Sequence, residues 1–256
     1  MTIVSTLDKL LLSMDLTPRQ TQILKAIVEE YIATAEAVGS DTLDKKYSLG
    51  VSPATIRNEM ATLSEKGFLT QPHTSAGRAP TPMGLRFYVN HLMQEKQMSV
   101  KDEVAAKEEV WDSRFDIDKL LREATLSLAR RTKTLAIAAT DSGDVYYAGT
   151  SNILNMPEFY DIDVAYSLLS LLDQHKKICN LFFDRQLSSE PVHILFGPDL
   201  DTPFMQPVGM AFSRFHTGKS GEITLGVIGP CRLNFPTIMP QVRYFSDMVS
   251  ELLNNY

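Results

Sequence analysis

The chain has little cysteine, histidine or tryptophan: its 256 residues include two cysteines, five histidines and one tryptophan, and the net charge is −6. Cys179 and Cys231 lie far apart between apolar or small neighbours, which in a reducing compartment predicts two small buried side chains rather than a disulfide or a redox pair. No hydrophobic run approaches the ~18–20 residues that span a bilayer. The N-terminus has one short apolar patch, residues 10–12, without a basic leader or a small-residue cleavage site. We therefore expect a cytoplasmic protein with no membrane segment.

The motifs of common enzymes are also missing. The sequence has no G-x-S-x-G motif, no Walker A loop and no paired His/Glu metal motif, and Gly226 with Gly229 does not form the G-x-G-x-x-G pattern of a nucleotide loop. Asp141, Asp144 and Asp199 stand near expected strand ends, where isolated aspartates are usually caps and turn formers. We therefore expect no catalysis, no cofactor and no metal.

The acidic charge is not spread evenly along the chain. Residues 1–90 contain nine Lys/Arg and nine Asp/Glu, whereas residues 91–256 contain sixteen and twenty-two. Within residues 51–90 there are four basic residues and two acidic ones, so this segment is locally positive. Because local contacts set the affinity for nucleic acid, the sign of the whole chain does not exclude DNA binding.

Three helices are predicted near the N-terminus. Thr17 and Gln20 form a capping box around Pro18, and apolar residues then recur at helical spacing. Gly39 breaks this pattern, and Gly67 ends the third helix. The predicted helices are residues 18–34, residues 41–47 capped by Ser40, and residues 53–66 capped by Ser52.

A short strand and a loop follow these helices. Residues 68–71 read as a strand, residues 72–80 as a polar loop, and Thr81 with Pro82 begins another helix. A helix-turn-helix followed by a strand and a loop containing glycine and arginine predicts a winged helix, in which the loop is the wing.

The rest of the chain has a different pattern. Residues 94–115 are mostly charged and polar, which favours a helical or flexible linker, with Trp111 anchoring it to a neighbour. Strands are expected at residues 134–140, 145–150, 178–183, 192–196, 209–216 and 222–228, and helices at residues 116–132, 161–175 and 237–254. The predicted organisation is a winged-helix domain at residues 1–93, the linker at residues 94–115, and an α+β domain at residues 116–256.

The third helix has two distinct faces. Ile56, Met60 and Leu63 share an inward stripe, which leaves small and hydrogen-bonding residues on the outer side. Such a face suits a helix in the DNA major groove, where Asn can pair with adenine, Arg with guanine, and the methyl group of Thr with thymine. An ordinary solvated helix face remains the alternative. The candidate residues on this helix are Ser52, Ala54, Thr55, Arg57, Asn58 and Thr62.

The loop from His73 to Arg78 adds groups that bind phosphate. It offers hydroxyls, backbone N–H groups around Gly77 and one guanidinium, which can lie along the DNA backbone or enter a minor groove. His73 has no metal-ligand spacing to another histidine or to a cysteine. The remaining candidate DNA-binding residues are Ser40, Thr42, His73, Thr74, Ser75, Gly77 and Arg78.

Four segments resemble the HrcA family of heat-inducible transcription repressors. They are LTPRQTQILKAIVEEYIATAEAVGS, LGVSPATIRNEMATLSEKGFLTQPHTSAGRAPT, GTSNILNMPEF and LGVIGPCRLNFP. The resemblance implies a dimeric winged-helix repressor that binds double-stranded DNA at an inverted-repeat operator before chaperone genes. It also implies a GAF-like C-terminal domain and a GroEL-type chaperonin partner. By motif position, residues 52–58 resemble the recognition helix and residues 73–78 the wing.

The chain departs from this family in two respects. Its members usually carry an inserted dimerising segment in the GAF-like part, whereas here residues 136–147 run almost directly into GTSNILN, so most of that segment is expected to be lost. Asp41 stands where the family often has a basic residue. A carboxylate there predicts weaker non-specific binding or a different operator.

Two other functions are compatible with the same winged-helix domain. The α+β domain could sense a small molecule, although no polar constellation in residues 133–235 points to a ligand class, so this rests on fold analogy. The winged helix could instead bind protein, but the local excess of arginine and the small outer face of the third helix argue against that.

Overall fold

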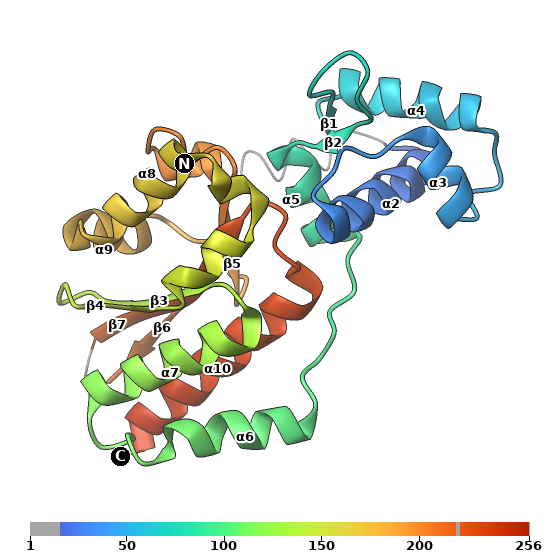
Figure 1. The fold of residues 1–256 in the computed structure, drawn as a ribbon. Helices are drawn as coiled ribbons and strands as arrows, with labels where there is room; N and C mark the ends of the chain where they lie inside the picture. Colours follow the sequence, from blue (N-terminus) through green and yellow to red (C-terminus); the bar gives the residue numbers. More distant parts are fainter. Residues whose placement is uncertain (1–15, 219–220, 256) are drawn as a thin grey trace. The chain divides into compact units, whose positions relative to one another are not determined.

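The computed structural model describes residues 16–218 and 221–255 of the chain (Figure 1). The chain divides after Gln94 into two compact units, which are described separately. The apolar patch at residues 10–12, considered above as a leader, lies outside the described residues. Among the residues described, no helix is both long enough and apolar enough to cross a membrane.

Within residues 16–94, the first unit has three helices, a two-stranded sheet and a fourth helix. Strands β1 and β2 are antiparallel, with Leu69 opposite Pro80 and Thr70 opposite Ala79. This is the element order expected for a winged helix, and β2 adds a second wing strand that the sequence did not predict. The elements are α2 (Pro18–Thr34), α3 (Ser40–Lys46), α4 (Pro53–Glu65), β1 (Leu69–Thr70), β2 (Ala79–Pro80) and α5 (Pro82–His91).

The helix starts predicted for the first unit are confirmed with one exception. The capping box of Thr17 is present, the N–H of Thr55 donates to Ser52 Oγ (3.2 Å), and the N–H of Gly84 donates to Thr81 Oγ1 (3.1 Å). The prediction that Ser40 caps the second helix is wrong. Gly39 is the N-cap and Ser40 is already helical, because the N–H of Leu43 reaches the carbonyl of Gly39.

The core of the first unit explains why these helices pack together. The predicted inward stripe of α4 is confirmed, since Ile56, Met60 and Leu63 are all buried. They lie in a mostly apolar interior that also buries Gln20, Glu30 and Ser40. Burying each apolar side chain contributes roughly 1.5–3 kcal/mol. Its other buried residues include Ile23, Leu24, Ile27, Leu43, Phe68, Leu85 and Tyr88.

The second unit is built on one antiparallel sheet with the strand order β4-β3-β7-β6-β5. This mixed architecture confirms the α+β class and agrees with the GAF-like domain expected from the sequence. Its helices are α6 (Val100–Trp111), α7 (Ile117–Thr132), α8 (Ile162–Leu172), α9 (His175–Phe183) and α10 (Phe235–Asn255). Its strands are β3 (Leu135–Thr140), β4 (Val145–Ala148), β5 (His193–Phe196), β6 (Val208–Thr217) and β7 (Gly221–Pro230), and its 3-10 turns are η1 (Thr150–Asn155), η2 (Pro157–Tyr160) and η3 (Gly197–Leu200).

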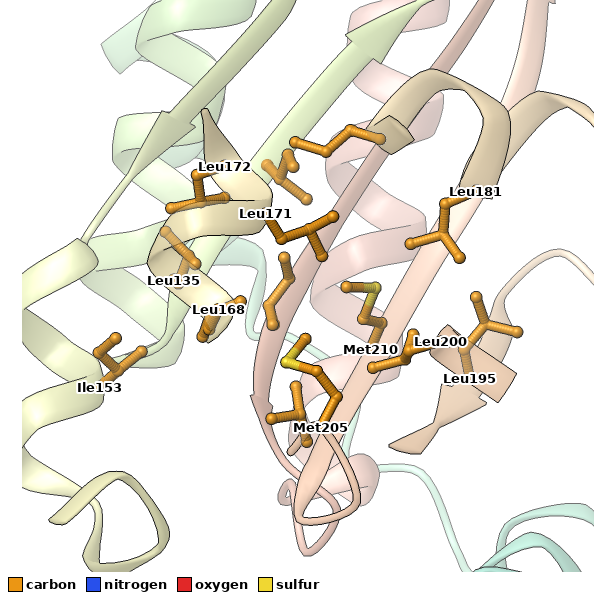
Figure 2. Packing of buried hydrophobic residues seen from close by; sticks show 14 of the residues in the cluster. Leu135, Ile153, Leu168, Leu171, Leu172, Leu181, Leu195, Leu200, Met205 and Met210 are labelled. Atoms are coloured by element: carbon orange, nitrogen blue, oxygen red, sulfur yellow. The ribbon is translucent and has the colours of Figure 1, made fainter. Parts of the chain in front are cut away.

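Helices cover both faces of this sheet. Helices α7 and α10 pack on one face, and α8 and α9 lie over the other (Figure 1). All six residues of β3 are buried, as expected for a strand covered on both sides. Figure 2 shows the second face, where leucines of α8 and α9 meet Met205, Met210 and Leu135 in one apolar cluster.

Two sequence expectations for this unit are wrong. Residues 178–183 form the end of helix α9 rather than a strand, because Ile178, Leu181 and Phe182 are buried at helical spacing. The helix expected at residues 161–175 ends at Leu172, and α9 begins as a separate helix at His175. A short apolar run fits either structure by pattern alone, which explains the first error.

The charged segment at residues 94–115 contains helix α6, which packs on the second unit. Ala106 and Val110 are fully buried, and the Tyr244 hydroxyl donates to the carbonyl of Glu103 (2.7 Å). Glu95 pairs through both oxygens with Arg243 of α10 (2.6 and 2.8 Å). In chain order this helix opens the α+β unit.

The two cysteines are free and partly buried. The Cys231 thiol donates to the carbonyl of Val208 (3.1 Å), and burial raises its pKa to about 11. Burial also raises the pKa of the Cys179 thiol. Both thiols are thus protonated and unreactive near neutral pH, although neither is as deeply buried as the sequence predicted.

Candidate nucleic-acid interface

The outer face of α4 is small and polar. Ala54, Arg57 and Asn58 are exposed, and Thr55 and Thr62 are half-exposed. Serine, threonine and asparagine side chains beside alanine leave room for a close approach of another surface. This face therefore has the shape and hydrogen-bonding groups expected of a helix that enters a major groove.

Glu59, an acidic residue beside this face, is already paired, whereas Glu65 on the last turn of α4 is exposed. Glu59 accepts a hydrogen bond from Gln20 Nε2 (3.0 Å) and forms an ion pair with Arg19 (3.6 Å). Lys66 Nζ in turn donates to Gln20 Oε1 (3.2 Å). Arg19 on the neighbouring helix α2 thus offsets the Glu59 carboxylate, which lowers its repulsion of a phosphate chain.

A hollow of about 330 Å³ lies between the start of α3, the side of α4 and the wing. It brings together six of the predicted DNA-binding residues: Ser40, Arg57, Thr74, Ser75, Gly77 and Arg78. The remaining lining residues are Gly39, Asp41, Met60, Gln71 and Ala76. Residues from three separate segments therefore surround one concave surface.

Backbone pairing fixes the wing to the segment after α2. The N–H of Val38 donates to the carbonyl of Arg78 (2.8 Å), and the N–H of Arg78 donates to the carbonyl of Val38 (2.9 Å). This bridge extends the small sheet beyond β1 and β2. It holds the Arg78 backbone at the edge of the hollow.

Gln71 holds the tip of the wing, and the sequence did not predict it. Its Nε2 donates to the carbonyls of Thr74 and Ala76 (2.9 Å each). The signal available in the sequence was an amide side chain immediately before Pro72, at the start of a loop. Its hydrogen-bond partners could not be predicted from the sequence, because they are backbone carbonyls whose positions depend on the conformation of the loop.

Two arginines and one aspartate set the charge of the hollow. Arg57 Nη2 donates to Ser40 Oγ at 3.4 Å, a long contact, and Ser40 itself is only 6% exposed. Arg78 Nε is buried without a hydrogen-bond partner in the described part of the chain. Asp41 is exposed at the same hollow. Two guanidiniums opposed by one carboxylate leave a site that favours an anion such as a phosphate.

The other predicted residues lie outside the hollow. Four of them already have local partners: Ser52, which caps α4, and Thr55 contact each other through their hydroxyls (3.0 Å), Thr62 Oγ1 donates to the carbonyl of Asn58 (3.3 Å), and His73 Nδ1 lies 3.2 Å from Ser75 Oγ. Ala54, Thr42 and the Asn58 side chain complete the set. The structure thus separates a polar helix face from a positively charged hollow beside it.

No metal centre is found at this surface or elsewhere in residues 16–218 and 221–255. No group of three or more His, Cys, Asp or Glu side chains in these residues is arranged to hold an ion.

The fold and the hollow define a class of two-unit proteins, in which a helical unit with a basic, hydroxyl-lined surface precedes an α+β domain. The family model for the HrcA protein C-terminal domain matches residues 84–239, which is more than half of the chain. The chain therefore belongs to the HrcA family, in agreement with the resemblance seen in its sequence.

Curated relatives extend this likeness over nearly the whole chain. A heat-inducible transcription repressor HrcA of Syntrophobacter fumaroxidans is 28% identical, covering 93% of this chain and 98% of the relative. The protein of the same name from Desulforudis audaxviator is 29% identical, covering 94% of this chain and 98% of the relative. A crystal structure described as a hypothetical protein at 2.2 Å resolution shares the fold, with a TM-score of 0.74 at 18% identity, covering 94% of this chain and 98% of that one.

The alignment lengths also show that this chain is shortened. The alignment with the Syntrophobacter protein spans 341 positions, whereas this chain has 256 residues. At least 85 aligned positions therefore have no residue from this chain. This fits the loss of an inserted segment in the second unit.

Proposed function

We propose that this chain is a DNA-binding transcription repressor of heat-shock genes. The observation that carries the proposal is the convergence of the polar α4 face with the basic hollow formed by α3, α4 and the wing. The names of the curated relatives support the same function. A repressor acts by binding rather than by chemistry, so no catalytic residues are assigned.

We assign different roles to the two parts of this surface. Helix α4 enters the major groove, where Asn58 and Arg57 reach base edges, Arg57 from the border between the α4 face and the hollow. The wing and the start of α3 hold the DNA backbone, with Arg78 on phosphate or in a minor groove. In this arrangement residues 1–93 bind DNA, and residues 94–256 provide the linker helix, the regulatory domain and dimer contacts.

The proposed operator is an inverted repeat bound by a homodimer. Two copies related by a two-fold axis would place their α4 helices in major grooves ~34–36 Å apart, or a multiple of this distance. The family resemblance supports both the dimer and a GroEL-type chaperonin as the partner that restores the repressor after heat stress. Asp41 at the hollow is expected to weaken binding to DNA of unrelated sequence.

The face of the sheet under helices α8 and α9 gives the small-molecule sensor no support. The space between the sheet and helices α8 and α9 is filled by an apolar cluster that includes Leu168, Leu171 and Met210 (Figure 2). We therefore retain DNA binding as the function that the described surface supports best.

Binding to the inverted repeat before the cell's own chaperone genes tests the proposal. Fluorescence anisotropy of the full chain with this duplex, against a scrambled duplex at physiological salt, should show at least a thousandfold preference for the operator. Equal affinity for both duplexes, or no binding, would reject the proposed function.

Three substitutions test the division of roles. Arg57→Ala and Asn58→Ala should each reduce discrimination between operator and altered bases by about 1–3 kcal/mol and leave the salt dependence almost unchanged. Arg78→Ala should weaken binding to all sequences and reduce the salt slope by about 1. Lys25→Ala is the control, because Lys25 lies on α2 and does not line the hollow. Identical behaviour of the three variants would contradict the assignment.

A further inference from the structure

Helix α6 presents an apolar stripe to solvent. Val100, Val104 and Trp111 are 75%, 51% and 37% exposed, although the same helix buries Ala106 and Val110 fully against its own unit. At about 100° per residue the three exposed side chains share one face of the helix. The helix is therefore apolar on two sides. On the second side Val100 and Val104 are largely exposed among the described residues, whereas the Arg114 guanidinium lies over the Trp111 ring (4.5 Å).

Complementary charges border this stripe on its outward side. Lys101 and Glu108 are both exposed, are seven residues apart, and form no ion pair within the described part of the chain. In heptad terms Val100, Val104, Lys107 and Trp111 take the core positions, and Lys107 is ion-paired with Glu251 of α10 (3.2 Å). Lys101 and Glu108 both take the adjacent e position. One edge of the stripe is thus positive at one end and negative at the other.

These features allow the helix to pair with a second copy of itself. In an antiparallel pair around a two-fold axis, e positions face e positions, so Lys101 meets Glu108 of the partner subunit twice. A parallel pair would instead place Glu103 beside Glu108 of the partner subunit, which is repulsive. We infer that α6 is the surface through which two copies of this chain associate, with the two helices antiparallel. This deepens the proposed function, on which it rests for the expectation of a dimer.

A second exposed apolar stripe does not fit the same partner. On α8 the residues Ile162, Tyr166 and Leu169 are exposed at helical spacing. The charged residues at the two ends of this stripe are Asp163 and Asp173, which are both exposed. An antiparallel two-fold pair would bring these carboxylates together, so self-association through α8 is disfavoured.

Charge exchange tests the inference on the full chain. By sedimentation equilibrium, Lys101→Glu and Glu108→Lys should each weaken self-association about tenfold, because both symmetric contacts change from attraction to repulsion. An equimolar mixture of the two variants should associate as strongly as the parent chain, because each variant then meets the opposite charge. One pair of short helices forms a small interface, so the association should be weak and the dimer fraction should rise over the range of protein concentrations measured.

The controls separate this inference from the proposed function. Val104→Asp should abolish association, whereas Tyr166→Asp on α8 should leave it unchanged. A parent chain that is monomeric at every concentration, single variants that keep its mass, or a mixture that stays dissociated would each overturn the role of α6. If the parent associates through α6 and still shows no operator preference, the repressor proposal fails and the α6 surface stands.

Discussion

At the scale of single residues, Gly77 determines how closely the wing approaches the rest of the first unit. A Cβ atom at this position would lie 2.3 Å from both the carbonyl carbon and the oxygen of Val38. Both atoms belong to the backbone and take part in the bridge to Arg78, so they cannot move aside without breaking it. The glycine is therefore required by space rather than by a left-handed conformation.

Gly77→Ala should accordingly displace the wing. We expect a loss of about 1–3 kcal/mol in the free energy of unfolding of the first unit, as for other overpacked sites. DNA affinity should fall with it, because Arg78 would leave the hollow. Thermal denaturation and operator binding measure the two effects. Gly218→Ala is the matched control, since a Cβ there meets nothing within 4 Å. An unchanged melting temperature for Gly77→Ala would contradict the account.

At the scale of secondary-structure elements, the sequence predicts best those features that depend on residues close together in the chain. The caps at Thr17, Ser52 and Thr81 were predictable, because each cap involves a side chain and a backbone N–H only three residues away. Helix α9 was not predictable, because an apolar pattern over six residues fits a strand as well as a helix. Only the burial of these residues in the apolar cluster distinguishes the two. The polar face of α4 could be predicted, but the hollow beside it depends on the bridge between Val38 and Arg78, forty residues apart.

The cap of α4 can be separated from its role at the DNA surface. Ser52→Ala should destabilise the protein by about 1 kcal/mol, because the N–H of Thr55 loses its partner. Ser52→Asp should restore stability, since a carboxylate caps as well as a hydroxyl, while its charge lowers DNA affinity. Thermal denaturation and operator binding measure both. If Ser52→Asp binds the operator as tightly as the parent chain, then Ser52 does not lie near phosphate.

At the scale of the whole molecule, the second unit is expected to limit stability in acid. Burial, and next the nearby Arg214, lower the pKa of His193 to about 4 from its ordinary 6.5. Arg214 is held in place by donating to the carbonyls of Phe182 and Phe183 at the end of α9 (3.2 and 3.3 Å). The folded unit therefore keeps His193 neutral over a pH range in which the unfolded chain binds a proton.

The sign of the pH dependence follows from this difference. Stability should fall as the pH decreases through 6.5, and the contribution of His193 should stop growing below about 4. Melting curves of the full chain between pH 7 and pH 4 measure it. His193→Gln should flatten the dependence in that window, whereas His216→Gln, at an exposed position on β6, should not. An equal slope for the parent and His193→Gln would contradict the prediction.

The pairing of β3 with β7 has a consequence for how the chain is made. Residues 135–140 pair along their length with residues 223–228, and α10, the last helix, covers the same sheet. During synthesis β3 leaves the ribosome long before β7 exists, so it can pair only with β4 while its apolar residues face water. Such long-range pairing slows folding and exposes strand edges to aggregation. We therefore expect the newly synthesised second unit to need a molecular chaperone in order to fold. The yield of native protein should then depend on how much chaperone in the cell is not occupied by other proteins.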